Sequence, residues 1–172
     1  MRFRGTVFRG HHPKWSWDPE SGEGARLHGG RFNPRGVDAL YTSLRPETAW
    51  LEAQAGFAAK AQPLLLCAYD ADCDGVLDLT DAATLAAQGI VPADLACAWE
   101  DQADRGEVPP SWRIAARLRM AGLAGIIVPS LARGATAADR NLALWRWSRE
   151  PPQAIRVIDD FARLPRDAAS WP

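Results

Sequence analysis

Strand-like and helix-like segments follow one another in this chain without a repeating order, and this constrains the fold more than any other feature. Alternating or continuous apolar residues predict strands over residues 2–9, 39–43, 63–70, 76–79, 125–129 and 153–158. Helical spacing predicts helices from Pro46 to about Lys60 and over 82–88, 93–104 and 111–120. Doubly wound folds need strands and helices to alternate regularly, so we expect an α+β fold with a mixed or antiparallel sheet.

Local signals indicate several boundaries. Thr80 or Asp81 is the expected N-cap of the second helix, because short polar side chains accept hydrogen bonds from the free N–H groups at a helix start. Ser111 is expected to cap the last helix in the same way, and Gly122 to end it. Residues 141–147 fit either a strand or a helix, and the alternation within them favours a strand.

Composition excludes several classes of protein. The 172 residues suit a single domain, and 47% hydrophobic with 24% charged residues is typical of a globular chain. The 20 basic and 21 acidic residues leave a net charge of −1, which argues against nucleic-acid or membrane binding by bulk attraction. The apolar run 124–128 is too short to span a bilayer, and no apolar segment follows the charged N-terminus. We therefore expect a cytoplasmic protein.

The three cysteines, Cys67, Cys73 and Cys97, point the same way. Their number is odd and they form no CxxC pair, so we expect reduced thiols rather than a disulfide framework.

A long stretch, residues 10–38, is rich in Gly, Pro, His and Trp and has no clean period, so we interpret it as a functional loop. Within it, residues 21–34 (SGEGARLHGGRFNP) place Arg26 and Arg31 among glycines. Glycines let a backbone approach a ligand closely, and arginine binds phosphate through two hydrogen bonds. The stretch fits an anion, above all a pyrophosphate; the alternative is a glycine-rich surface turn.

Three further side chains are candidates for chemistry. Tyr41 lies on a predicted strand, and Glu52 lies on the helix that follows it, among apolar neighbours. Such a carboxylate either stands in water at a helix edge or is held in a pocket for a purpose. Ser130 follows the strand 125–129 without the Gly-x-Ser-x-Gly pattern of a nucleophile, so we interpret it as a ligand-binding hydroxyl.

Residues 70–81 (DADCDGVLDLTD) nearly fit a calcium-binding loop. Asp81 stands where that pattern needs a bidentate Glu, and residues 64–69 favour a strand over an entering helix. We interpret the segment as an acidic turn between two strands. The three histidines stand at no zinc-like spacing, and we expect no metal.

Taken in order, these residues resemble the RES domain family, which is named for an Arg, a Glu and a Ser. The matching stretches are 8–10, 29–36 (GGRFNPRG), 39–43 (ALYTS), 48–52 (TAWLE), 77–81, 127–130 (IVPS) and 141–144. The likeness covers about residues 7–158 of a single domain, 1–172, that ends in a short tail. Residues 11–15 and 21–26 resemble a subgroup whose members include toxins described as ADP-ribosylating a host enzyme.

This resemblance implies an ADP-ribosyltransferase-like α+β fold, with helices around the sheet, and an enzyme that consumes NAD⁺ as a substrate. It also implies the toxin half of a toxin–antitoxin pair, whose antitoxin carries a helix-turn-helix domain of the Xre type, and a possible host protein target. Arg31, Glu52 and Ser130 match the three name residues. Tyr41 matches the family's aromatic residue, and Arg9 matches a further basic position.

The implied roles agree with the chemistry of NAD⁺. Breaking the nicotinamide–ribose bond develops positive charge on the sugar, which the Glu52 carboxylate would stabilise. Arg31, with Arg9, would hold the pyrophosphate. Tyr41 would stack on the nicotinamide ring, and Ser130 would hydrogen-bond the ribose or the carboxamide.

Arg26, Gly30 and Asn33 are further candidates for NAD⁺ binding within the glycine-rich stretch. The acceptor of the ADP-ribose is expected to be a protein. The alternatives are inorganic phosphate or water, as in an NAD phosphorylase or glycohydrolase. A different class of alternative is a calcium- or ligand-binding module without enzymatic activity.

Overall fold

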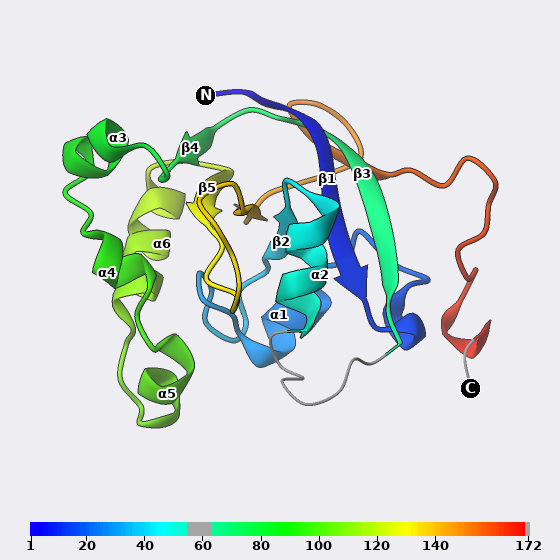
Figure 1. Ribbon diagram of the computed structural model, residues 1–172, viewed down its shortest axis with the longest axis horizontal. Helices are drawn as coiled ribbons and strands as arrows, with labels where there is room; N and C mark the ends of the chain where they lie inside the picture. The colour runs from blue at the N-terminus through cyan, green and yellow to red at the C-terminus, as the bar shows by residue number, and fades with distance from the viewer. Residues whose placement is uncertain (55–62, 171–172) are drawn as a thin grey trace.

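The computed structural model describes residues 1–54 and 63–170, and a seven-stranded sheet forms its centre (Figure 1). The strands are β1 Phe3–His11, β2 Leu40–Ser43, β3 Leu65–Cys73, β4 Val76–Asp78, β5 Gly125–Pro129, β6 Arg140–Leu144 and β7 Gln153–Val157. The helices are α1 Glu23–His28, α2 Pro46–Gln54, α3 Ala82–Ala87, α4 Pro92–Leu95, α5 Trp99–Asp104 and α6 Pro110–Met120. Two 3₁₀ turns, η1 Pro13–Trp15 and η2 Ala168–Ser170, complete the described elements.

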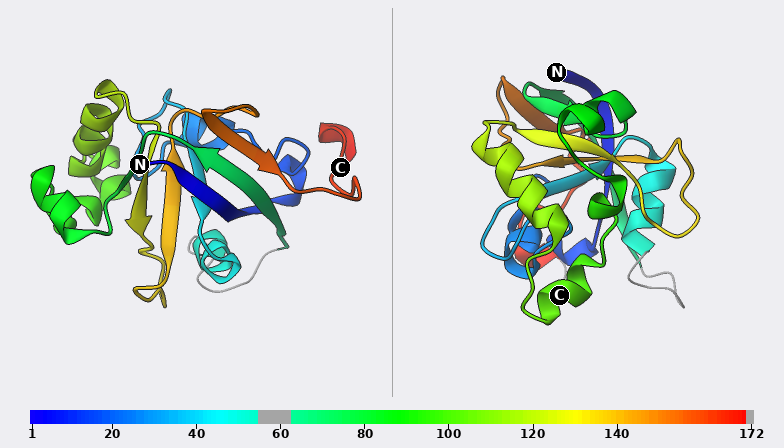
Figure 2. Two further views of the ribbon diagram at one scale, coloured as in Figure 1. Left: turned by 90° about the horizontal axis from the view of Figure 1, so that it is seen from above. Right: turned by 90° about the vertical axis from the view of Figure 1, so that its left-hand side faces the viewer.

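The strand order is β4-β5-β6-β2-β1-β3-β7, and only the β4–β5 pair is parallel. The longest pairing joins β1 to β3 in antiparallel register, from Phe3 opposite Cys73 to His11 opposite Leu65. Helices α3 to α6 gather at the β4–β5 end of the sheet, and the C-terminal segment lies at the other end (Figure 2). The expected α+β class with a mixed, mainly antiparallel sheet is confirmed.

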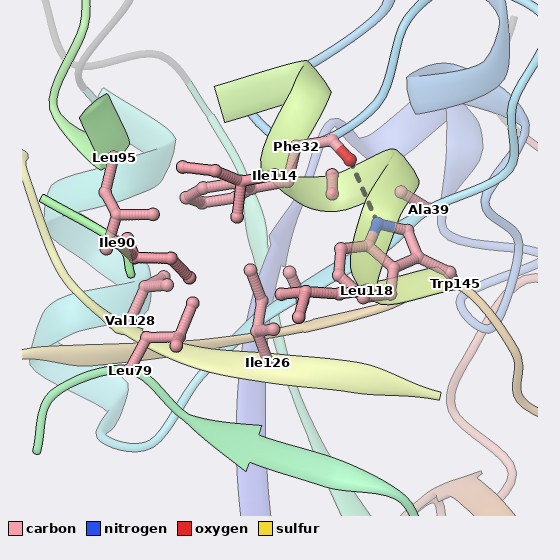
Figure 3. Packing of buried hydrophobic residues seen from close by; sticks show 12 residues of the cluster. Phe32, Ala39, Leu79, Ile90, Leu95, Ile114, Leu118, Ile126, Val128 and Trp145 are labelled. Atoms are coloured by element: carbon pink, nitrogen blue, oxygen red, sulfur yellow. Dashed lines mark hydrogen bonds between the residues drawn. The ribbon is translucent and has the colours of Figure 1, made fainter. Parts of the chain in front are cut away.

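The core lies on both faces of the sheet, and β5 contributes to each. Ile126 and Val128 pack in one cluster with Leu118 of α6, whereas Ile127 belongs to the cluster on the other face. Figure 3 shows the first cluster, in which the α6 side chains lie over β5 and the Trp145 indole points to the Phe32 carbonyl. The side chains of a strand alternate between faces, and each fully buried Leu or Ile stabilises the fold by about 1.5–3 kcal/mol. The apolar run in β5 therefore binds the helical layer to the sheet.

Most predicted elements are confirmed, including a strand within 141–147, where β6 ends at Leu144, and the N-cap Asp81, which accepts a hydrogen bond from the Thr84 N–H. The predicted helix from Pro46 is described as far as Gln54, and its expected continuation to Lys60 lies outside the described residues.

The prediction of one helix over residues 93–104 is wrong. Two short helices, α4 and α5, occupy this stretch, and residues 96–98 interrupt them. The carbonyl groups of Leu95 and Cys97 turn instead toward the Arg31 guanidinium, with N···O distances of 3.3 and 2.6 Å. These two carbonyl groups accept hydrogen bonds from the Arg31 cation.

Two further local interpretations of the sequence are also corrected. The stretch 10–38 contains a helix, α1, whose six residues are too few to display a helical period. Ser111 does not cap α6; Pro109 occupies the cap position, and Ser111 is fully buried, where its hydroxyl accepts a bond from the Cys97 thiol.

The segment 70–81 is not one acidic turn, because β3 continues to Cys73 and the turn is confined to Asp74 and Gly75. Its carboxylates have separate partners. Asp72 pairs with Arg2, and Asp78 accepts bonds from the N–H and hydroxyl of Thr80. Gly75 adopts φ +74°, a left-handed conformation that favours glycine.

None of the helices in residues 1–54 and 63–170 is long and apolar enough to cross a membrane.

Candidate active site

A cleft of about 520 Å³ opens beside β1, β2 and α2. Among the side chains that line it are those of Arg9, Arg31, Tyr41, Glu52, Trp99 and Asn141. A smaller hollow of about 170 Å³ adjoins it, shares Arg31, Tyr41, Glu52 and Asn141, and is bordered by Pro129 and Leu131. We refer to both together as the cleft.

The Glu52 carboxylate is held by two neutral hydrogen-bond donors. Its Oε1 accepts a bond from the Ser130 hydroxyl at 2.6 Å and from the Asn141 amide at 2.5 Å. The Ser43 hydroxyl in turn donates to Asn141 Oδ1 at 2.7 Å. Both bonds to the carboxylate go to Oε1, and within residues 1–54 and 63–170 no hydrogen bond is given to Oε2. One oxygen is thus fixed while the other is available to a ligand.

Sheet register brings these donors to Glu52. Asn141 lies opposite Val128 on β5 and opposite Ser43 on β2, and Ser130 follows the last residue of β5. Ser130 is itself buried. Donors that belong to a paired sheet have little freedom to move, so the geometry around the carboxylate is set before any ligand binds.

The helix that carries Glu52 is anchored near its start by a buried carboxylate. Asp139 accepts a 2.5 Å hydrogen bond from the Thr48 hydroxyl of α2. Its other oxygen accepts bonds of 2.8 Å from the backbone N–H and the hydroxyl of Thr136. The Thr48 and Thr136 hydrogen bonds lower the pKa of Asp139 to about 2. Asp139 therefore ties α2 to the segment that connects Ser130 with Asn141.

Across the cleft, Arg31 is held by backbone carbonyl groups rather than by a carboxylate. Its Nη1 donates to the carbonyl oxygens of Leu95 and Cys97. Burial lowers the pKa of Arg31, and electrostatic interactions with the neighbouring Cys97 and Glu52 side chains act in the opposite direction. An arginine pKa starts above 12, so the guanidinium stays charged at neutral pH. Neutral partners leave its positive charge available for an anion.

The backbone on either side of Arg31 is also held in place. The Trp112 indole N–H donates to the Gly30 carbonyl at 2.8 Å, and the Trp145 indole N–H donates to the Phe32 carbonyl at 2.9 Å (Figure 3). The two indoles come from α6 and from the end of β6, so the helical layer and the sheet both position this segment.

Tyr41 and Asn33 form the floor beneath the segment. The Tyr41 hydroxyl accepts a bond from the Phe32 N–H at 2.9 Å and donates to Asn33 Oδ1 at 2.7 Å. Burial raises the pKa of Tyr41 above its usual value, so the phenol stays protonated. A Cβ on Gly30 would come within 2.7 Å of the Tyr41 hydroxyl and of Asn33 Oδ1. Only glycine fits at this position.

Asn33 itself is fully buried and supports the loop. Its amide nitrogen donates to the carbonyl oxygens of Ala25, Pro34 and Val37, at 2.8, 3.2 and 2.9 Å. With its oxygen accepting from Tyr41, the side chain joins α1, the glycine-rich segment and β2.

The second arginine of the cleft, Arg9 on β1, repeats the arrangement of Arg31. Its Nη1 donates to the carbonyl oxygens of Pro19 and Ser21, at 3.2 and 2.8 Å. Burial lowers the pKa of Arg9. The Tyr69 hydroxyl also donates to the Pro19 carbonyl, at 2.8 Å. Two side chains of the sheet thus fix the loop that faces Arg9.

His11 is the other partner of Tyr69. His11 Nε2 lies 2.5 Å from the Tyr69 hydroxyl oxygen, and burial together with the nearby Arg9 charge lowers the pKa of His11 to about 3. The imidazole is therefore neutral at physiological pH and supports the loop without adding charge.

The structure brings most of the predicted site residues together. Arg31, Tyr41, Glu52 and Arg9 line one cleft, and the Ser130 hydroxyl reaches it through Glu52. Gly30 lines the cleft as well, whereas Asn33 lies beneath it. The Arg26 guanidinium is turned away, toward Glu23 and Asp38 at 3.3 and 3.7 Å.

Sequence reasoning missed two residues of the cleft. The family resemblance included Asn141 only as part of the stretch 141–144. The one signal in the sequence for a role in the cleft was its polar side chain directly before an apolar run. Trp99 lines the cleft from α5, and nothing in its sequence context distinguishes it from a core tryptophan.

A negative group and two positive groups across an open cleft can bind an anionic ligand and stabilise a cation that develops within it. Among residues 1–54 and 63–170, no group of three His, Cys, Asp or Glu side chains could hold a metal ion.

Comparisons with known proteins show the family and the fold of the chain. The family model described as the RES domain matches residues 6–167. Among solved structures, the chain is similar to a chain in the crystal structure of the M. tuberculosis MbcT–MbcA toxin–antitoxin complex. The TM-score is 0.65 with 21% sequence identity, over 92% of this chain and 84% of that chain. No curated protein sequence matches significantly.

Proposed function

The chain belongs to the RES domain family, and from that premise we propose that it is an enzyme that breaks the nicotinamide–ribose bond of NAD⁺ and acts as a toxin. The observation that carries the proposal is the pair of opposed charges in the cleft. Glu52 is fixed by Ser130 and Asn141, and Arg31 lines the same cleft, where its guanidinium donates to the neutral carbonyl groups of Leu95 and Cys97.

Glu52 acts on the sugar. When the C–N bond to nicotinamide breaks, its electron pair leaves with the nicotinamide nitrogen and the ribose becomes an oxocarbenium ion. A carboxylate beside the ring stabilises that cation more than it stabilises the ground state, which accelerates the bond-breaking step. Ser130 and Asn141 hold the carboxylate in place through Oε1, and Oε2 faces the substrate.

The arginines act on the pyrophosphate. Arg31 and Arg9 each use one nitrogen for carbonyl partners, and a guanidinium has five N–H donors in all. The remaining donors bind phosphate oxygens. Tyr41 packs against the nicotinamide ring, and Gly30 lets the backbone approach the ligand closely. Asn33 supports this surface from below, and Arg26 has no assigned contact in this scheme.

The finer part of the proposal is that ADP-ribose passes to a protein. The acceptor's nucleophilic atom bonds to the ribose carbon that nicotinamide has left, and its proton passes to the solvent. The side of the cleft next to Ser130 carries Pro129 and Leu131, both exposed, with Leu131 at 48%. Apolar side chains at the mouth of a site favour a macromolecular acceptor, because phosphate or water gains nothing from them.

The experiment is to incubate purified protein with NAD⁺ and measure free nicotinamide, with and without inorganic phosphate, and then to add labelled NAD⁺ to a bacterial lysate. Nicotinamide release is the expected result, and its absence at every enzyme concentration would refute the enzymatic proposal. One discrete labelled protein band supports transfer to protein. Phosphate-stimulated release with ADP-ribose 1″-phosphate as product would instead identify a phosphorylase.

The toxin role has its own test. The similar solved structure is of a toxin–antitoxin complex, and we infer that this chain has an antitoxin partner of the helix-turn-helix, Xre type. Expression of the wild-type chain alone is expected to arrest bacterial growth, and co-expression of the antitoxin is expected to restore it. Normal growth at high soluble yield without an antitoxin would contradict the toxin role.

A further inference from the structure

A second cavity, of about 420 Å³, adjoins the cleft on the side of the N-terminal loop. Arg9, Gly10 and Gly24 line both cavities. The volume lies within the range of small-molecule sites. Because Arg9 borders both spaces, a ligand that extends from Tyr41 and Glu52 past Arg9 would enter this second cavity.

Part of the wall of the second cavity is aromatic and apolar and is exposed, beside polar residues that include Asp18 and Glu23. Trp15, Trp17 and Leu27 line it, with exposed fractions of 57%, 37% and 51%. Two exposed tryptophans and a leucine around one cavity differ from singly scattered apolar residues, and such clusters mark binding sites.

The loop that carries these tryptophans is nonetheless held firmly. Besides the bonds of Arg9 and Tyr69 to the Pro19 carbonyl, the Trp147 indole donates to the Glu20 carbonyl at 2.8 Å. The Glu20 carboxylate accepts bonds from Arg149 at 2.7 Å and from the Val157 N–H at 2.9 Å. Ser16, between the two tryptophans, is fully buried. The exposed aromatic surface is therefore built into the fold.

We propose that this second cavity binds the adenine base of NAD⁺. The inference rests on the proposed function. It assigns a binding site to the adenosine half of NAD⁺, which the cleft does not hold. In NAD⁺ the pyrophosphate lies between the two nucleoside halves, and Arg9 lies between the two cavities. Indole rings stack on a purine base, and the half-buried guanidinium of Arg9 between the cavities binds the phosphates.

Gly24 keeps the passage between the cavities open. It lies in α1 and lines both spaces, and a Cβ built on it meets no heavy atom within 4 Å. The fold would accept a larger side chain at this helical position, since glycine is the weaker helix former. A leucine there would occupy space that the ligand needs.

The test compares two substrates, NAD⁺ and nicotinamide mononucleotide, which has the same scissile bond but no adenosine half. Trp17→Ala is expected to reduce kcat/KM for NAD⁺ by about tenfold or more, mainly through KM, because a stacked base is lost. The rate with nicotinamide mononucleotide should not change. Trp50→Ala is the matched control, since Trp50 is 47% exposed and lines neither cavity.

A direct binding measurement with ADP separates this inference from the proposed function. ADP should bind the wild type and bind Trp17→Ala at least about tenfold more weakly, whether or not nicotinamide is released. No release with retained ADP binding would refute the proposed function and still support the adenine site. Equal losses on both substrates, no loss on either, or loss of protein labelling with unchanged nicotinamide release would overturn the adenine site.

Discussion

The two sides of the cleft are built in different ways. On the negative side, Glu52 and the donors that hold it belong to α2, the end of β5 and β6, which are joined by helical and sheet hydrogen bonds. On the positive side, Arg31 and Arg9 depend on carbonyl groups of irregular segments, at 95–97 and 19–21.

This difference matches what each side has to do in the proposed reaction. A carboxylate that stabilises a short-lived cation acts only if it is placed accurately, and paired strands place it so. Phosphate groups are bound by charge and by several donors, which tolerate small displacements. In the proposed reaction, regular structure thus positions the group that acts on the broken bond, and irregular backbone positions the groups that bind the phosphates.

The largest effect is expected on the negative side. Glu52→Gln keeps an oxygen for Ser130 and Asn141 but removes the charge, and should lower kcat for nicotinamide release about a hundred- to a thousandfold. KM and the melting temperature should change little. Glu47→Ala, on the exposed face of the same helix, is the control. A folded Glu52→Gln protein with near-normal kcat would remove Glu52 from the mechanism.

Arg31→Ala should show the opposite kinetic pattern. A charged hydrogen-bond partner contributes about 1.5–3 kcal/mol, so KM for NAD⁺ should rise about 10- to 100-fold while kcat falls less. Arg35→Ala, an exposed arginine in the same segment, is the matched control. If Arg31→Ala lowers kcat and leaves KM unchanged, the division of labour between the two sides is wrong.

Asn141 tests whether accurate placement of the carboxylate matters. Asn141→Ala removes one of the two bonds to Oε1, and should lower kcat about tenfold with little change in KM. Asn141→Asp sets a second carboxylate against Glu52, which raises the pKa at which the pair loses its proton. The activity of Asn141→Asp should therefore recover as pH rises, and the rising limb of its pH–kcat profile should be shifted to higher pH than that of the wild type. Identical profiles would show that Asn141 has only a packing role.

The smallest effect concerns stability. The pKa of Asp139 is lowered in the folded protein to about 2, from 3.8. Its stabilising contribution is therefore complete above that ordinary value and is lost as pH falls toward 2. Asp139→Asn should melt at a lower temperature at pH 7, and its melting temperature should fall less than that of the wild type between pH 4 and pH 2. Asp160→Asn, at an exposed position, should change neither the melting temperature at pH 7 nor its fall between pH 4 and pH 2.

Much of the fold follows from local pattern. The alternation in β1, the apolar run of β5 and the proline at the start of α2 each predict their element, because burial and backbone restriction act within a few residues. The break between α4 and α5 could not be predicted in this way. At the break, the Leu95 and Cys97 carbonyl groups accept hydrogen bonds from the Arg31 guanidinium, which lies more than sixty positions away along the chain.

The candidate site was less accessible to local pattern. Local context made Arg31, Tyr41, Glu52 and Ser130 separate candidates, but only the resemblance to a family assigned them to one site, since they lie far apart in sequence and share no spacing. Asn141 was missed because its position beside Glu52 depends on the pairing of β6 with both β2 and β5. The sequence of a strand does not specify which strands it pairs with. Backbone carbonyl groups have no sequence signature at all.

The two indole N–H groups that hold the Gly30 and Phe32 carbonyls have a thermodynamic consequence. The conformational entropy of the segment around Arg31 is lost when the protein folds, not when a ligand arrives. Ligand binding then requires no ordering of that segment. The affinity for the ligand therefore depends on how well α6 is packed. A substitution on the buried face of α6, such as at Leu118, would loosen Trp112 and weaken binding in a cleft that it does not touch.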